Sequence, residues 1–162
     1  MIVPLNLLLI MCLTAITYQD FKERKVFWFL FPLAMLLFGL LYYVQVTGMS
    51  VFLYQILTNI FLVTSIWTIL FLYTHFITKK KFLNHSLGLG DILFFYTLGL
   101  GFPTLTFIVL FVGSTLFSLL VFLIIKRNLN HKTVPLAGLM GLFIIFVLLY
   151  SFIFKYPPLY GY

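Results

Sequence analysis

Long apolar segments alternate along the chain with short polar segments, and this alternation predicts the secondary structure. An apolar stretch of about 20 residues crosses the hydrocarbon core of a bilayer as a helix. By this criterion we expect six spans, at residues 3–17, 26–46, 51–77, 92–102, 104–125 and 134–154. The pattern therefore predicts an all-α integral membrane protein, a bundle of about six transmembrane helices forming a single domain over residues 1–162.

The fourth and fifth predicted spans are separated by helix-breaking residues alone. Gly99, Gly101 and Pro103 interrupt an otherwise continuous apolar run, and this combination ends helices. The fourth span is short for a complete crossing at about 1.5 Å per residue. We therefore expect it to begin or end inside the bilayer, packed against protein.

The composition agrees with a membrane protein. Hydrophobic residues make up 64% of the chain, aromatic residues 20% and charged residues 8%, which excludes a water-soluble globule of this size. The net charge of +7 comes from short basic clusters between apolar runs. That pattern is typical of cytoplasmic loops and argues against nucleic acid as a partner. Cys12, the single cysteine, lies in an apolar run, so we expect it to be a buried small hydrophobe.

The basic residues also predict the orientation. Nine of them fall in the loops after the first, third and fifth spans: Lys22, Arg24, Lys25, Lys79, Lys80, Lys81, Lys126, Arg127 and Lys132. The positive-inside rule places these loops in the cytoplasm, against an anionic lipid leaflet, and both termini outside. Only Lys155 falls on the far side. We expect a multi-pass protein of the cell's inner (cytoplasmic) membrane whose first span is retained and is not a signal peptide.

Acidic residues are rare, and their positions suggest chemistry. Asp20 follows the first span, Glu23 lies three residues later, and Asp91 opens the fourth span after Leu87-Gly88-Leu89-Gly90. A carboxylate at a membrane boundary is costly unless it is paired, hydrated or used. The predicted topology places Asp20 and Asp91 on the same side at the same depth, so they are candidate neighbours. The alternatives are a solvated loop charge for Asp20 and a helix N-cap for Asp91.

The glycines before Asp91 have a possible use of their own. Gly88 and Gly90 lack Cβ atoms, which permits close approach of another chain and positive φ. An extended substrate peptide could lie beside the aspartate, although an ordinary flexible loop is the simpler interpretation.

These residues resemble the type IV prepilin peptidases and archaeal preflagellin peptidases, which are membrane aspartic proteases with a Gly-x-Gly-Asp motif. Six spans, an aspartate after the first span and an aspartate opening the fourth carry the resemblance over nearly the whole chain. The resemblance implies catalytic residues Asp20 and Asp91, a substrate-binding role for Gly88 and Gly90, and cleavage of the leader of a prepilin-like protein at the cytoplasmic face. The sequence Val134-Pro135-Leu136-Ala137-Gly138 resembles the opening of the family's last span, although proline is common in the first turn of any helix.

The implied mechanism is that of an aspartic protease with no metal and no cofactor. One ionised carboxylate takes a proton from water, and the other, protonated, polarises the scissile carbonyl. Two close carboxylates share one proton, and the helix-start position of Asp91 favours it as the base. Because the leader of such a substrate is basic, Glu23 could reduce repulsion from the basic loops, although a solvated neighbour of Arg24 is the simpler role.

The chain departs from the family in three places. Val26-Phe27 stands where members often have Ile-Pro, and Ile92, Leu93 and Phe94 follow Asp91 where many have a lysine. The methyltransferase part with its cysteine pairs is also missing, so pilin N-methylation is not predicted.

Other functions use the same residues. A small proton- or cation-coupled transporter would place both aspartates near the midplane of the membrane and would show an inverted repeat, which we do not find. A non-catalytic scaffold of the same fold would bind and not cleave. Proteases of the presenilin type are larger, and in them a tyrosine directly precedes the first aspartate, whereas Gln19 separates Tyr18 from Asp20 here.

Overall fold

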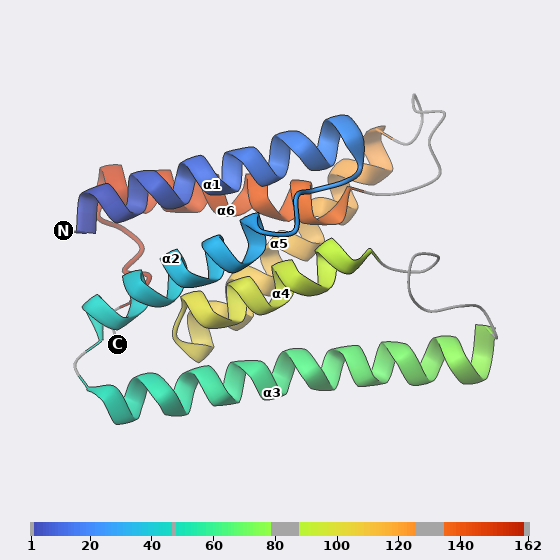
Figure 1. Cartoon of the computed structure of the whole chain (residues 1–162), viewed down its shortest axis with the longest axis horizontal. Helices are drawn as coiled ribbons and strands as arrows, with labels where there is room; N and C mark the ends of the chain where they lie inside the picture. The colour runs from blue at the N-terminus through green and yellow to red at the C-terminus, as the bar shows by residue number, and fades with distance from the viewer. Residues whose placement is uncertain (1, 47, 79–87, 126–134, 161–162) are drawn as a thin grey trace.

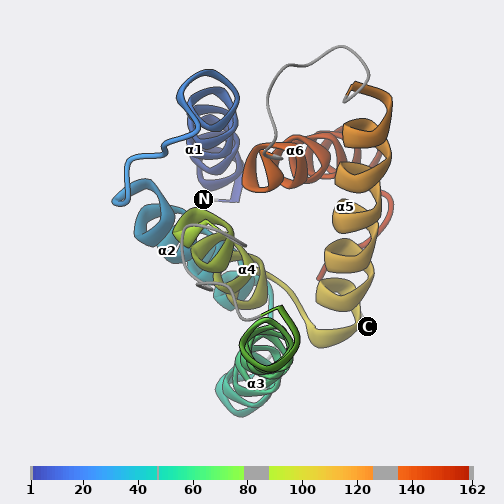
Figure 2. The ribbon, with the colours of Figure 1, turned by 90° about the vertical axis from the view of Figure 1, so that its right-hand side faces the viewer.

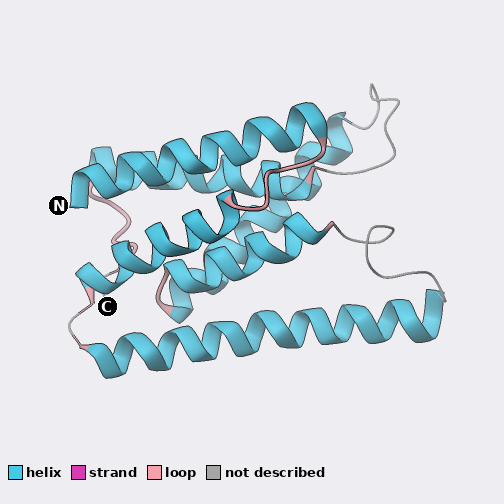
Figure 3. Cartoon of the chain, viewed as in Figure 1, coloured by secondary structure: helices cyan, strands magenta, loops and turns pink. Residues whose placement is uncertain are grey.

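The computed structural model describes residues 2–46, 48–78, 88–125 and 135–160. Within these ranges every element is a helix and no β-strand occurs (Figures 1 and 3). The elements are α1 (Ile2–Glu23), α2 (Leu30–Gln45), α3 (Met49–Tyr73), the π-helical turn η1 (Thr74–Thr78), α4 (Leu89–Gly101), α5 (Thr104–Ile125) and α6 (Leu136–Phe154). The expectation of an all-α fold with about six helices is confirmed for these residues.

Four helices are long and apolar enough to cross a membrane, namely α1, α3 with its extension to Phe76, α5 and α6. They indicate a membrane-embedded protein. The helices α2 and α4 are shorter, with 16 and 13 residues, or about 24 and 20 Å at 1.5 Å per residue. Both fall short of the roughly 30 Å of a hydrocarbon core.

The prediction for α2 was too long, and Pro32 explains the difference. The apolar run begins at Val26, but the helix begins at Leu30. Proline lacks an N–H group and its ring clashes with the preceding helical turn, so it is tolerated only in the first turn of a helix. Residues 24–29 instead form an irregular connection, in which the backbone N–H of Phe27 donates to the side-chain Oε1 of Gln19 at 3.0 Å.

The core lies where α1, α2, α4 and α6 meet. The pair α1 and α6 packs closely, and α2 packs against both α1 and α4. The fully buried side chains at these contacts include Leu13, Ile16, Phe31, Phe38, Phe94, Leu98, Met140 and Ile144. The expected burial of Cys12 is confirmed, and its thiol donates to the carbonyl of Leu30 at 3.5 Å.

The helix α3 lies at the edge of the bundle, as the end-on view shows (Figure 2). It packs mainly on α4. Only 17% of the most apolar part of this helix is buried by the rest of the protein. Such an apolar surface is stable only in contact with lipid or protein. The arrangement therefore agrees with a bilayer around this helix.

The break between α4 and α5 falls where the sequence predicts it. The helix α4 ends at Gly101 and α5 begins at Thr104, on either side of Pro103. Asn59 of α3, fully buried, donates from Nδ2 to the carbonyls of Gly99 at 2.8 Å and Phe102 at 2.9 Å. These bonds satisfy carbonyl groups that the end of a helix leaves without partners. The two hydrogen bonds from α3 thereby stabilise the end of α4 that Pro103 and the two glycines set.

Candidate active site

Three helix ends meet at the end of the bundle that is opposite the chain termini. They are the last turn of α1, the first turn of α4 and the first turn of α6 (Figure 1). Each contributes one part of a site: Asp20 from α1, Asp91 from α4, and the backbone of Ala137 and Gly138 from α6.

Asp20 lies in the last turn of α1, because the helix continues to Glu23. The sequence predicted that the first span would end at about residue 17, and this was wrong. The side-chain Oδ2 of Asp20 accepts a hydrogen bond from the backbone N–H of Gly138 at 2.6 Å. The carboxyl group is half-buried, so the interpretation of Asp20 as a solvated loop charge is also wrong.

Asp91 occupies the third residue of α4, and Gly88 is the N-cap. The alternative interpretation of Asp91 as the N-cap was therefore wrong by one turn. Its Oδ1 accepts from the backbone N–H of Ala137 at 3.0 Å, and its Oδ2 accepts from the backbone N–H of Gly88 at 3.3 Å. The second bond is the carboxylate half of a capping box. One carboxylate thus ties the start of α4 to the start of α6.

The structure brings the two aspartates together through consecutive residues of one helix. The amide groups of Ala137 and Gly138 are among the first N–H groups of α6, which have no partner within the helix. Such groups bind anions, with help from the helix dipole. The start of α6 therefore holds both carboxylates at once, although they are separated by about seventy positions in the sequence.

The electrostatics of the pair make the site easier to protonate than a free aspartate. Burial raises the pKa of Asp91 to about 6, and repulsion from Asp20 adds to the rise. The hydrogen bonds from Ala137 and Gly88 act in the opposite direction and lower the pKa of Asp91. Burial also raises the pKa of Asp20, whereas the short amide bond from Gly138 and the charge of Arg24 act to lower it. Asp91 is therefore protonated more readily than Asp20.

Glycine at two positions of α6 permits this close approach. A Cβ atom on Gly138 would lie 3.0 Å from Oδ2 and 3.1 Å from Cβ of Asp20. One turn later, a Cβ on Gly141 would lie 2.8 Å from Oγ1 of Thr17. The helices α1 and α6 can therefore pack closely enough for the hydrogen bond to Asp20 because neither glycine carries a side chain.

The two glycines before Asp91 differ in their surroundings. Gly88 is exposed beside the carboxylate, and a Cβ there would lie 3.3 Å from Oδ2 of Asp91. Gly90 faces Phe31 of α2, whose ring would lie 3.3 Å from an added Cβ, so helix packing alone explains its small size. No described glycine has positive φ, which corrects that expectation. Their substrate-binding role stays a prediction.

Glu23 is exposed at the end of α1, next to Arg24, whose φ of 54° turns the chain out of the helix. Its predicted role toward a basic leader stays a prediction. The described residues contain no group of three His, Cys, Asp or Glu side chains that could hold a metal ion. Leu87, Val134 and the lysines at 79–81 lie outside the described residues.

The contribution of the α6 backbone was not predicted. Residues 134–138 stood out in the sequence only for their resemblance to the opening of a helix, whereas the amides of Ala137 and Gly138 are the groups that join the aspartates. The feature that could have indicated it was Pro135, which is the N-cap of α6, followed by small residues.

Comparisons with protein-family models, with curated proteins and with solved structures find no match for this chain.

Proposed function

We propose that this protein is a membrane aspartic endopeptidase that cleaves the leader of type IV prepilin-like precursors, with Asp20 and Asp91 as its catalytic dyad. The observation that supports this proposal is the pair of half-buried carboxylates held by consecutive amides of α6. Both groups are partly accessible, so water and a peptide carbonyl can reach them. The Gly-x-Gly-Asp sequence and the order of the two aspartates support the choice of substrate.

In the proposed mechanism, Asp20 is the ionised base and Asp91 holds the shared proton. Asp20 takes a proton from water as the water oxygen attacks the scissile carbonyl carbon, and Asp91 gives its proton to the carbonyl oxygen, which yields a tetrahedral diol. Asp91 then takes a proton back from the diol as the C–N bond breaks, and Asp20 gives its proton to the leaving amine. The amide of Gly138 and the charge of Arg24 stabilise the anion of Asp20. This assignment reverses the one favoured by the sequence, where the helix-start position alone suggested Asp91 as the base.

The proposed topology is six crossings in the inner membrane, with both termini outside and the dyad at the cytoplasmic face. The basic loops support this orientation. The short helices α2 and α4 lie beside each other in the bundle, and their lengths imply a locally thin hydrophobic layer there. Gly88 and Glu23, both exposed at the dyad end, would face the incoming leader.

A cleavage assay tests the proposal. Protein purified in detergent is incubated with a prepilin-like precursor, and release of the leader is followed by gel electrophoresis and mass spectrometry. The wild type should release it, and Asp20→Asn and Asp91→Asn should each lower the rate about 10³-fold or more, because each removes one half of the acid–base pair. Cleavage by either variant at the wild-type rate would contradict the proposed dyad.

Thr14→Ala is the matched control. Thr14 lies on α1 about two turns before Asp20, is exposed, and donates only to the carbonyl of Ile10 at 2.7 Å. We expect wild-type cleavage from this variant. Similar melting temperatures for all three variants would show that the loss in the aspartate variants is chemical.

A further inference from the structure

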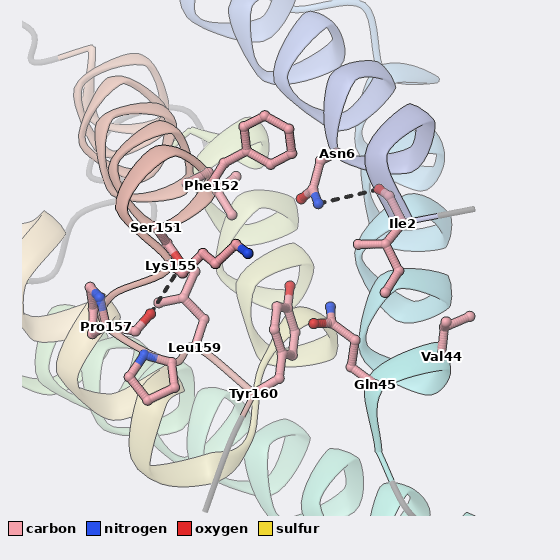
Figure 4. Close-up of a pocket in the computed structure, with 12 residues that line it drawn as sticks. Ile2, Asn6, Val44, Gln45, Ser151, Phe152, Lys155, Pro157, Leu159 and Tyr160 are labelled. Carbon is pink, nitrogen blue, oxygen red and sulfur yellow. Dashed lines mark hydrogen bonds between the residues drawn. The ribbon is translucent and has the colours of Figure 1, made fainter.

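A cavity of about 620 Å³ lies at the other end of the bundle, among the first turn of α1, the last turn of α2 and the end of α6 (Figure 4). Residues 157–160, which follow α6, close one side of it. The volume is within the range of small-molecule sites, roughly 300–1,000 Å³. No residue of the proposed dyad lines it, so its use is independent of the proposed peptidase function.

The charge of this cavity has one sign. Lys155 lines it and extends its amino group toward α1, between Asn6 and Tyr160 (Figure 4). The three acidic side chains of the chain, at positions 20, 23 and 91, all belong to the opposite end. The cavity therefore presents a positive charge with no acidic side chain to balance it, which favours an anionic ligand.

Lys155 also has an unusual backbone. It is the residue at which α6 ends, and it adopts a left-handed conformation with φ of 54° and ψ of 23°. Glycine is the usual residue there, because a side chain costs about 1 kcal/mol in this region. A lysine at this position suggests that its side chain has a functional role. The left-handed conformation also turns the polypeptide, so that residues 157–160 line the cavity.

Tyr160 adds a second donor. Its hydroxyl group is buried and has no hydrogen-bond partner among the described residues, a state that costs about 1–3 kcal/mol unless a ligand or water satisfies it. The ring is fixed between Tyr42 and Phe102, with centroid distances of 6.1 and 5.6 Å. Burial raises the pKa of the Tyr160 hydroxyl, so it keeps its proton as a donor.

The remaining lining combines amides with apolar surface. Asn6 and Gln45 each donate one hydrogen bond to a backbone carbonyl of their own helix, at 3.2 and 3.1 Å, and each retains a second N–H. The apolar residues of the lining are Ile2, Val44, Leu148, Phe152 and Leu159. A ligand that matches both parts has a negatively charged head and a hydrocarbon tail.

We propose that this cavity binds one anionic phospholipid, with the phosphate on Lys155 and Tyr160 and an acyl chain along the apolar wall. The cavity lies where helices end, which is the depth of lipid headgroups. A zwitterionic lipid fits less well, because no acidic side chain at this end can receive its ammonium group. Free phosphate shares the charge but would leave the apolar wall in contact with water.

Native mass spectrometry of the delipidated full-length protein tests the proposal, with phosphatidylglycerol as the probe. The wild type should bind one molecule, and Lys155→Gln should weaken that binding about tenfold or more, the value of one charge-assisted hydrogen bond. Tyr160→Phe should weaken it less, and phosphatidylcholine should bind more weakly than phosphatidylglycerol. Tyr160→Phe keeps the test valid if Lys155→Gln does not fold.

Lys22→Gln is the control, since it removes the same charge at the opposite end and should leave binding within about twofold of the wild type. Equal binding of phosphatidylglycerol by the wild type, Lys155→Gln and Tyr160→Phe would overturn the proposal. Displacement of the lipid by inorganic phosphate at equal concentration would also overturn it, because the site would then recognise the ion without the chain.

Discussion

The two ends of the bundle use opposite kinds of packing. At the dyad end, Gly138 and Gly141 let α1 and α6 approach until a carboxylate meets a backbone amide at 2.6 Å. At the end with the termini, large rings stack around Tyr160 and a cavity remains beside it. Small residues at the first end therefore fix the position of a carboxylate by close helix contact, whereas large rings at the other end do not interdigitate fully and leave a cavity.

The two ends also differ in how their polar groups are satisfied. The carboxylates of the dyad accept three backbone hydrogen bonds between them, from Gly88, Ala137 and Gly138. The hydroxyl of Tyr160 has none among the described residues. Satisfied groups hold a structure in place, and an unsatisfied buried group marks a point where an additional molecule would stabilise it.

The largest expected effect concerns the dyad as a unit. If Asp20 and Asp91 share one proton, the double variant Asp20→Asn/Asp91→Asn should be no slower than either single variant, about 10³-fold or more below the wild type, because either change removes the same function. Initial rates of leader release measure this. Losses that multiply in the double variant would show that the two residues act separately.

The next effect concerns the close approach of α1 and α6. Gly138→Ala places a Cβ atom 3.0 Å from Oδ2 of Asp20, so the carboxylate must move. The shift needed is a few tenths of an ångström, and since a misplacement of about 1 Å costs about 100-fold, we expect the rate to fall about 10-fold. Cleavage kinetics and a thermal melt in detergent separate lost activity from lost stability.

Gly39→Ala is the matched control for this variant. Gly39 lies in α2 with no atom within 4 Å of an added Cβ, so alanine there should leave the rate unchanged and add up to about 1 kcal/mol of helix stability. If both glycine variants lost activity equally, helix propensity and not the approach to Asp20 would be the cause.

A smaller effect is expected at the opposite end. Tyr160→Phe removes a buried hydroxyl group that has no partner among the described residues, and it retains the ring between Tyr42 and Phe102. In delipidated protein we expect this change to stabilise the fold by about 1 kcal/mol, because an unsatisfied polar group is lost. Denaturation of the delipidated protein measures it, and a clear destabilisation would show that the hydroxyl has a partner within the chain.

The smallest expected effect is a shift in pH dependence. With the pKa of Asp91 raised to about 6, the dyad should lose its shared proton, and cleavage should decline, as the pH rises through that region. Arg24→Gln removes a positive charge that favours the anionic form of Asp20, so the acid limb, which reports ionisation of Asp20, should move to higher pH by roughly a few tenths of a unit at moderate salt. A pH profile of kcat/KM checks the direction, and a shift to lower pH would contradict the role of Arg24.

The helices were predictable where a single local cause decides them. The apolar runs gave α3 and α5 closely, and Pro103 with two glycines gave the break after α4. The start of α2 was placed too early, at residue 26, because the prediction used hydropathy alone and did not consider that Pro32 must lie in the first turn of the helix. The end of α1 was misplaced because charged residues were taken to end a helix, whereas Lys22 and Glu23 can project from a helix end into a polar region without breaking it.

The residues of the candidate site were predictable, but their arrangement was not. Three acidic residues in 162 made Asp20 and Asp91 conspicuous, and the loop charges suggested that they share one side. The sequence could not show which atoms would hold them, because backbone amides are present at every position. Only the packing of α6 against α1 and α4 brought the amides of Ala137 and Gly138 to the two carboxylates.

The sequence by itself determined that the chain is helical and apolar and that its few acids lie at the ends of apolar segments, since these properties follow from local composition and periodicity. The tertiary structure decided that α6 joins the two aspartates and that a cavity with Lys155 remains at the other end. Both features depend on how close helices approach, and that distance is set by side-chain size at contacts between residues far apart in the chain.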